Sequence, residues 1–216
     1  RLPGKPLLKI NGLSIISHVF KRAINANIGD VIVAAEDQEI IDDVKKNGGQ
    51  AILTGSHHKT GTDRIYEVIN KIEKNNIDLI MNLQGDEPLM NVEDIKNLNE
   101  YMSKSNSNMG TLACKISEKK TYQNENIVKV TTKESLENSK FPEAINFTRK
   151  VLDKSKKTYN HLGIYCYRLE TLKKFVSLKQ SSNEIKNKLE QLRALDNNIK
   201  INVALASSSP IGVDTK

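Results

Sequence analysis

An acidic turn follows a short apolar segment near the middle of the chain. Residues 78–83 (DLIMNL) are typical of a buried strand, and residues 84–88 (QGDEP) combine a glycine, a proline and two carboxylates. In open α/β sheets, ligands bind at the carboxyl ends of the strands. Asp86 would therefore lie at a ligand-binding edge, where a carboxylate can hold Mg²⁺ against phosphate groups. Gly85 would allow the backbone to approach the ligand.

A second segment suited to phosphate lies at the start of the chain. Residues 1–6 (RLPGKP) contain two prolines, one glycine and two cations. The prolines stiffen the segment, and the glycine permits close approach of a ligand. Arg1 and Lys5 can then clasp a polyphosphate from two sides. The segment lacks the G-x-x-x-x-G-K-[ST] pattern of a P-loop, and an ordinary turn between two elements is the alternative interpretation.

The order of helices and strands predicts an α/β fold. In the first half, the apolar pattern predicts helices over residues 14–27, 37–47, around 65–72 and 92–103, and strands over 30–35, 50–54 and 78–83. This alternation is typical of a doubly wound, mostly parallel, Rossmann-like sheet. In the second half it predicts strands over 109–116, 127–132, 144–148, 161–168 and 200–206, and helices over 169–176 and 185–195. We expect this half to extend the sheet and to form a smaller subdomain over its ligand edge.

Composition indicates a globular protein with anionic partners. Of the 216 residues, 38% are apolar and 27% are charged, and the formal net charge is +7. Such a charge favours nucleotides, phosphates, acidic sugars or nucleic acid. The basic residues are scattered along the chain, so much of this charge is expected to be solvated surface. No apolar run approaches the roughly 18 residues needed to span a bilayer, so no membrane association is predicted.

Cysteine and histidine show no spacing typical of a disulfide framework or a zinc site. Cys114 and Cys166 each lie in an apolar, strand-like segment, and there is no C-x-x-C pair. We expect both to be buried thiols in a reducing compartment. His57 and His58 adjoin each other, but no further metal ligand lies nearby in the sequence, so the pair is interpreted as loop structure.

Six short segments together resemble motifs of the sugar cytidylyltransferases. They are residues 1–7 (RLPGKPL), 60–64 (TGTDR), 84–88 (QGDEP), 161–165 (HLGIY), 189–193 (LEQLR) and 212–215 (GVDT). The last three are similar to the branch that acts on 3-deoxy-manno-octulosonate (Kdo). The resemblance implies one domain over residues 1–216, with a nucleotide-binding part at 1–108 and a sugar-binding and dimerisation part at 109–216. It also implies incomplete termini, because the family's first strand would precede the chain and its terminal helix would follow it.

The resemblance implies cytidylyl transfer from CTP to Kdo, giving CMP-Kdo and pyrophosphate for lipopolysaccharide synthesis. The anomeric hydroxyl of the sugar would attack the α-phosphorus in line, which requires alignment and charge neutralisation. A Mg²⁺-dependent, cytoplasmic homodimer is expected, with no nucleic-acid or membrane partner. Two alternatives are a cytidylyltransferase for another acidic sugar, such as an N-acylneuraminate, and a basic, non-enzymatic nucleotide- or nucleic-acid-binding domain. A third is a nucleotide-binding protein that has lost its activity.

The same resemblance assigns roles to individual residues. Asp86 and Asp214 would bind Mg²⁺, and Arg1 and Lys5 would stabilise the departing pyrophosphate. The cytosine-recognising segment would contribute Thr60, Gly61 and Arg64. Recognition of the sugar acid would depend on Gln84, Arg149, His161, Tyr165, Glu190 and Gln191.

Overall fold

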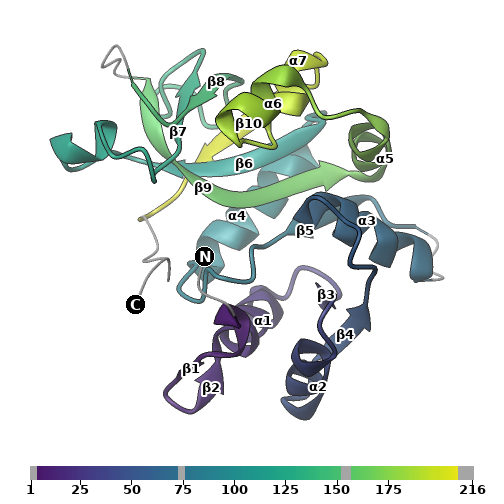
Figure 1. The fold of residues 1–216 in the computed structure, drawn as a ribbon. Helices are drawn as coiled ribbons and strands as arrows, with labels where there is room; N and C mark the ends of the chain where they lie inside the picture. The colour runs from purple at the N-terminus through teal and green to yellow at the C-terminus, as the bar shows by residue number, and fades with distance from the viewer. Residues whose placement is uncertain (1–3, 73–75, 152–156, 209–216) are drawn as a thin grey trace. The chain divides into compact units, whose positions relative to one another are not determined.

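The computed structural model describes residues 4–72, 76–151 and 157–208 (Figure 1). These residues form two compact units. The first contains the described residues up to Asn76 together with residues 82–96, and the second contains residues 77–81 and the described residues from Asn97 onward. Helix α4 (Val92–Lys104) begins in the first unit and ends in the second. The division at residue 108 within one domain stays a prediction.

The core of the first unit is a helix-covered pair of parallel strands. Strands β3 (Ile32–Ala35) and β4 (Gln50–Leu53) pair in parallel. Helix α2 (Gln38–Lys46) supplies the crossover that a parallel pair requires, and it lies against β4 in Figure 1. Helix α1 (Ile15–Ala26) completes the layer, and its apolar face packs with those of α2, β3 and β4. The predicted helices and strands of this region are confirmed.

A small hairpin precedes α1 that the apolar pattern did not predict. Strands β1 (Lys9–Ile10) and β2 (Leu13–Ser14) pair antiparallel around Asn11 and Gly12. Both turn residues have positive φ, 51° and 81°, which is the conformation that favours Asn-Gly in a two-residue hairpin loop. The hairpin thus brings the chain from the short 3₁₀ helix η1 (Lys5–Leu7) to the start of α1.

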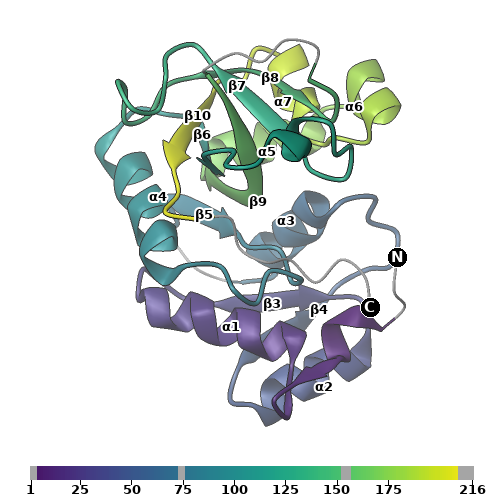
Figure 2. The same cartoon turned by 90° about the vertical axis from the view of Figure 1, so that its left-hand side faces the viewer.

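The second unit is built on a six-stranded sheet. It contains β5 (Leu79–Asn82), β6 (Met109–Cys114), β7 (Lys129–Thr132), β8 (Ala144–Thr148), β9 (Thr158–Arg168) and β10 (Ile201–Leu205). The order is β10-β6-β9-β7-β8, with β5 also paired to β9 (Figure 2). Strands β10 and β6 are parallel, but the β6–β9, β9–β7 and β7–β8 pairs are antiparallel.

The α/β class is confirmed, whereas the predicted mostly parallel pairing does not extend to these central strands. Antiparallel neighbours need no helical crossover. The sequence pattern accordingly predicted strands without intervening helices between residues 109 and 168. The strands after Met109 pair with one another, and a bridge between Glu143 and Asn202 joins the β8 side of the sheet to β10. Unpaired strand edges in this half would favour a homodimer, but the described strands are paired with one another and give no such support.

The helices of the second unit differ from prediction in one place. Helix α5 (Leu169–Ser177) lies where it was expected. The single helix predicted over residues 185–195 is instead two, α6 (Ser182–Asn187) and α7 (Leu192–Asp196), which lie side by side in both views. The break occurs because Lys188 adopts a left-handed conformation, with φ 54°. Residues 189–191 consequently form a bend between two short helices.

The prediction for the two cysteines is confirmed. Cys114 and Cys166 are both free and buried, as expected, and burial raises the pKa of the Cys166 thiol to about 12. Among the described residues, no helix combines the length and the apolar composition needed to cross a membrane.

Candidate active site

The first unit brings the phosphate-binding segment and the acidic turn together. Lys5 lies in η1, and Asp86 follows β5. The Nζ atom of Lys5 donates to Oδ2 of Asp86 at 3.0 Å, although the two residues are 81 positions apart in the sequence. The Asp86 side chain stays 45% exposed, so one carboxylate remains open to a ligand beside a cation. Such a pair can receive a polyphosphate and a divalent cation that keeps its own waters.

Gly85 also has a packing role. A Cβ atom at this position would lie 3.0 Å from the Cδ1 atom of Ile16, a buried residue of α1. The glycine therefore allows close packing of the acidic turn against α1. This packing fixes the position of the backbone that carries Asp86. Gln84, the predicted sugar contact in the same turn, accepts the Glu87 N–H through its carbonyl and donates its amide to Asn82 at 3.4 Å.

The predicted cytosine-recognising segment begins α3 (Gly61–Lys71). Thr60 is the N-cap: its hydroxyl accepts the Asp63 N–H at 3.3 Å and donates to the Asp63 carboxylate at 2.9 Å. No atom lies within 4 Å of the position of a Cβ on Gly61, so the helix start is open to a ligand.

Arg64 is held by neighbours in the first unit. Its guanidinium donates to Glu36 Oε2 and to Thr54 Oγ1, both at 2.6 Å, and to the Gly55 carbonyl at 3.3 Å. The contact with Glu36 is an ion pair. The guanidinium joins the ends of β3 and β4 to α3, and so fixes the orientation of the helix start.

A β-bulge in the second unit gathers His161 and Tyr165. Thr111 of β6 pairs with Tyr165, but the next residue, Leu112, pairs with Leu162, so β9 carries two extra residues at this point. Four residues of regular strand span about 13 Å. The ring centroids of His161 and Tyr165 are only 5.4 Å apart, because the bulge bends the strand between them.

The buried hydroxyl of Thr111 sets the tautomer of His161. It donates its one hydrogen to the Ile164 carbonyl at 2.6 Å and lies 3.0 Å from His161 Nε2. Nε2 must therefore carry the hydrogen and donate it to Thr111, which leaves Nδ1 as an acceptor. Burial lowers the pKa of His161 to about 3. The ring is neutral at physiological pH and cannot act as a cation for the sugar carboxylate.

Tyr165 and Glu190 are electrostatically coupled in the same unit. Burial, and after it the charges of Tyr167 and Glu190, raise the pKa of Tyr165 well above its usual value. The phenol therefore stays protonated and can donate a hydrogen bond. Glu190 and Gln191 lie in the bend between α6 and α7, and Gln191 is buried. His161, Tyr165 and Glu190 thus offer an acceptor, a donor and a carboxylate, a set suited to sugar hydroxyls.

A buried ion pair supports the bend that carries Glu190 and Gln191. Arg193 Nε and Nη2 donate to the two oxygens of Glu184 at 2.8 and 2.6 Å, and the exposed fractions of the two side chains are 2% and 4%. The guanidinium also lies over the ring of Phe175, 4.6 Å from its centroid. The ion pair thus links α7 to α6, and the contact with Phe175 links α7 to α5.

Arg149 closes the other side of that bend. Its guanidinium donates to the carbonyls of Glu125, Asn187 and Lys188 at 3.1 to 3.5 Å, and so links the end of β8 to the end of α6. The fully buried Lys129 donates to the Arg149 carbonyl at 2.8 Å. Desolvation by burial, and then the charge of Arg149, lower the pKa of Lys129. Sequence reasoning missed Lys129, whose position in a strand gave no signal of a polar role.

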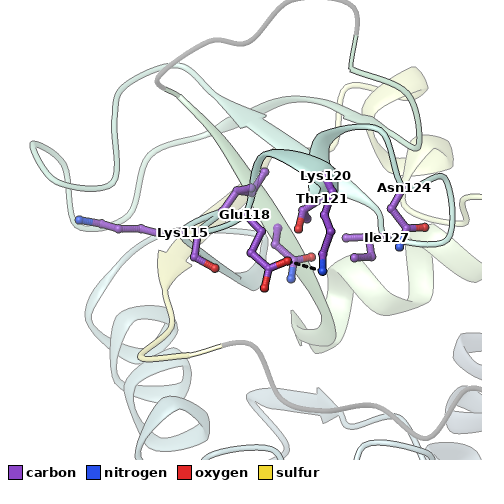
Figure 3. Close-up of a pocket in the computed structure, with 9 residues that line it drawn as sticks. Lys115, Glu118, Lys120, Thr121, Asn124 and Ile127 are labelled. Atoms are coloured by element: carbon purple, nitrogen blue, oxygen red, sulfur yellow. Dashed lines mark ion pairs between the residues drawn. The ribbon is translucent and has the colours of Figure 1, made fainter.

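Two predicted residues lie outside the described part of the chain, and the second unit contains a pocket. Arg1 and Asp214 lie outside the described residues. A pocket of about 360 Å³ opens in the second unit beyond the end of β6, and Figure 3 shows the Lys120–Glu118 ion pair within it. It is lined by Lys115, Ile116, Ser117, Glu118, Lys120, Thr121, Asn124, Ile127 and Asn160. No predicted site residue lines it, although Asn160 directly precedes His161.

The depressed pKa of His161 predicts a particular pH dependence of stability. An unfolded histidine binds a proton near pH 6.5, but folded His161 does so only near pH 3, so the unfolded state binds more protons in this window. The contribution of the neutral ring is complete above about pH 6.5 and is lost as the pH falls. The free energy of unfolding, measured by urea denaturation at several pH values, should rise less steeply with pH in His161→Gln than in the unmodified protein. The difference in slope should be at most about 1.4 kcal/mol per pH unit. Equal slopes would contradict the buried, neutral ring.

Comparison with known proteins defines the class of the chain. A family model described as Cytidylyltransferase matches residues 1–201. This chain also shares its fold with a solved structure of 4-diphosphocytidyl-2C-methyl-D-erythritol synthase from Anaerococcus prevotii. The TM-score is 0.63 at 15% identity, over 98% of this chain and 88% of the other. The fold and the family match together define a nucleotidyltransferase.

Relatives of higher sequence identity show which nucleotidyltransferase family the chain belongs to. The 3-deoxy-manno-octulosonate cytidylyltransferase of Thermodesulfovibrio yellowstonii is 42% identical over 228 residues, which cover 100% of this chain and 89% of the relative. That of Paramagnetospirillum magneticum is 37% identical over 217 residues, with 100% and 88% covered. A solved structure of CMP:2-keto-3-deoxy-manno-octonic acid synthetase complexed with CTP has a TM-score of 0.88 at 35% identity, over 100% of this chain and 88% of that one. The chain belongs to the 3-deoxy-manno-octulosonate cytidylyltransferase family, and the resemblance of the six segments is confirmed.

Proposed function

We propose that this nucleotidyltransferase transfers the cytidylyl group of CTP to Kdo, releasing pyrophosphate and giving CMP-Kdo. The observation that carries the proposal is the contact of Lys5 with Asp86. It joins two motifs that are distant in the sequence into one cation–carboxylate pair, of the kind that binds a metal-complexed triphosphate. Membership of the family supports the choice of CTP and Kdo.

The nucleotide contacts belong to the first unit. Lys5 and Arg1 would stabilise the negative charge that develops on the departing pyrophosphate. The open helix start at Thr60 and Gly61 would read the cytosine, and Arg64 would hold that start in place through Glu36 and Thr54.

Asp86, together with Asp214, would hold Mg²⁺. The half-exposed carboxylate of Asp86 fits this ion, because Mg²⁺ prefers one or two carboxylate oxygens completed by water and phosphate. When bound, the ion neutralises the triphosphate and lowers the pKa of an oxygen nucleophile. Lys5 competes for Oδ2 of Asp86, so we expect its ammonium to move to the phosphates when the nucleotide binds.

The sugar contacts would come from the second unit, apart from Gln84. His161 Nδ1, the Tyr165 hydroxyl and Glu190 would bind hydroxyls, with Gln191 at the same bend. The Kdo carboxylate would be left to Arg149, because His161 is neutral. Arg149 uses three of its five N–H donors on carbonyls of the described residues, so its guanidinium is fixed in direction while donors remain for a carboxylate.

Two further expectations accompany this function. The free, buried cysteines are compatible with a reducing compartment, which supports a cytoplasmic location. A homodimer is proposed from the family alone, and sedimentation of the full-length protein tests it.

The proposed reaction is tested by pyrophosphate release from the full-length protein supplied with CTP and a panel of acidic sugars, with and without Mg²⁺. Kdo should be the best acceptor, and removal of Mg²⁺ should abolish the signal. Preference for an N-acylneuraminate would assign the chain to another acidic sugar. Binding of CTP without any pyrophosphate release would indicate a nucleotide-binding protein without activity. Affinity for DNA or RNA that falls steeply with salt would favour a nucleic-acid-binding domain.

A further inference from the structure

Three potential metal ligands meet in the first unit, away from the Lys5–Asp86 pair. The ligand atoms of His57, His58 and Glu67 all lie within 4.8 Å of one another. The two histidines precede α3, and Glu67 lies in the second turn of that helix, so helix formation supplies the third ligand that the local sequence lacked. His58 contacts Glu67 Oε2 through Nε2, and this contact alone would explain His58 as a residue that holds the loop against α3. It gives no reason for a second, exposed imidazole at His57.

The backbone at Gly55 is shaped to admit this second ring. A Cβ on Gly55 would lie 2.4 and 2.5 Å from Cε1 and Nδ1 of His57, and 3.6 Å from Oε2 of Glu67. His57 Nδ1 and Glu67 Oε2 therefore flank the same point above the glycine, and any side chain there would collide with the ring. The rings of His57 and His58 are 4.3 Å apart between centroids, at 38° to each other. Both imidazoles thus lie close to the carboxylate and to each other.

Glu67 is prepared to act as an anionic ligand. Hydrogen bonds from Lys71, from His58 and from the Gly55 N–H lower the pKa of Glu67 to about 2. Lys71 binds Oε1 at 2.6 Å, whereas His58 and the Gly55 N–H contact Oε2. A metal on Oε2 would leave Lys71 in place as an outer partner that orients the carboxylate, an arrangement common around protein metal sites.

We propose that His57, His58 and Glu67 form a binding site for a divalent transition metal of the Zn²⁺ or Co²⁺ type. Two imidazoles and one carboxylate are the ligand set of many zinc sites, with the fourth position left to water. Tetrahedral zinc at about 2.0 Å from each ligand separates those ligands by roughly 3.3 Å. Small side-chain rotations bring atoms within 4.8 Å to that spacing. Mg²⁺ favours an all-oxygen set and is excluded from this site.

The test measures metal binding itself, independently of catalysis. Full-length, metal-free protein is titrated with Co²⁺, followed by its visible absorption, and with Zn²⁺ by calorimetry, in the presence of excess Mg²⁺. We expect one tight site per chain and Co²⁺ bands of a four- or five-coordinate ion. His57→Gln should weaken binding by at least about 100-fold, since loss of a ligand exceeds the 10–100-fold effect of losing an outer partner. Because His57 is exposed, this variant should keep its fold.

Matched variants separate the site from other histidines and from misfolding. His18→Gln changes a half-buried histidine of α1 that lies outside the cluster, and it should bind Co²⁺ as the unmodified protein does. Gly55→Ala keeps all three ligands but displaces the His57 ring, and it should also lose the tight site. Absence of saturable Co²⁺ and Zn²⁺ binding, or equal affinity in His57→Gln, would overturn the proposal.

Discussion

Replacing Asp86 by Asn should lower the turnover number for pyrophosphate release about 10³-fold, or roughly 4 kcal/mol of transition-state stabilisation. The amide keeps the shape of the side chain but removes the charge that would hold Mg²⁺ beside Lys5. The loss should appear mainly in the turnover number, because charge on the leaving pyrophosphate grows in the transition state. Steady-state kinetics over a range of Mg²⁺ concentrations measures it, and excess Mg²⁺ should restore only part of the activity.

A matched control uses the other end of the same strand. Asp78 precedes β5 and is exposed, so Asp78→Asn makes the same chemical change at the same strand without touching the pair. Its turnover should stay within about twofold, since surface substitutions of this kind are usually close to neutral. Circular dichroism should show that both variants keep the fold. Normal turnover in Asp86→Asn would remove Asp86 from the active site, whatever the fate of the metal site at His57.

Replacing Arg193 by Met should reduce the free energy of unfolding by about 3–5 kcal/mol. The change strands the buried Glu184 carboxylate, which loses two hydrogen bonds from the guanidinium and has almost no access to water. It also removes the cation from the face of Phe175. Urea denaturation at neutral pH measures the loss. The bend at residues 189–191 should loosen as well, which hydrogen exchange can detect.

The double variant Glu184→Gln with Arg193→Met tests the cause. Removing the stranded charge should recover part of the stability, because a neutral partner costs less to bury. In the unmodified protein, burial pushes the pKa of Glu184 upward, but hydrogen bonds from Arg193 and Gln180 outweigh it and leave the pKa lowered. The pair therefore stabilises the fold above the unfolded pKa, and this contribution is lost as the pH falls through the folded pKa. A double variant as unstable as Arg193→Met would show that packing, and not charge, dominates.

Apolar periodicity was sufficient for most of the secondary structure. The helices α1, α2 and α4 and the strands β3, β4 and β8 lie where the sequence pattern placed them, because each has one continuous apolar face or a buried apolar run. The pattern failed where backbone conformation decides. The left-handed Lys188 splits one predicted helix, and the Asn11–Gly12 hairpin has strands too short to alternate. Strand direction in the second unit depends on long-range pairing, which periodicity does not encode.

The candidate site was predictable only as a set of motifs. Residue type and order singled out Lys5 and Asp86, and the structure places them in contact. The sequence could not show that His161 is neutral, because that depends on burial and on Thr111 from another strand. Nor could it show that Glu67 faces the two histidines, since the approach requires both α3 and the bare backbone of Gly55.

The two extra residues in β9 restrict how this strand can change in length. Side chains alternate between the faces of a strand, so losing one residue at Gly163 or Ile164 would turn every later side chain of β9 to the opposite face. Cys166 would then occupy the position of Tyr165, and Tyr165 would occupy that of Ile164. Losing both residues together would preserve the alternation and would leave Tyr165 two positions from His161 on the same face of a regular strand. Insertions and deletions compatible with folding should therefore come in even numbers here.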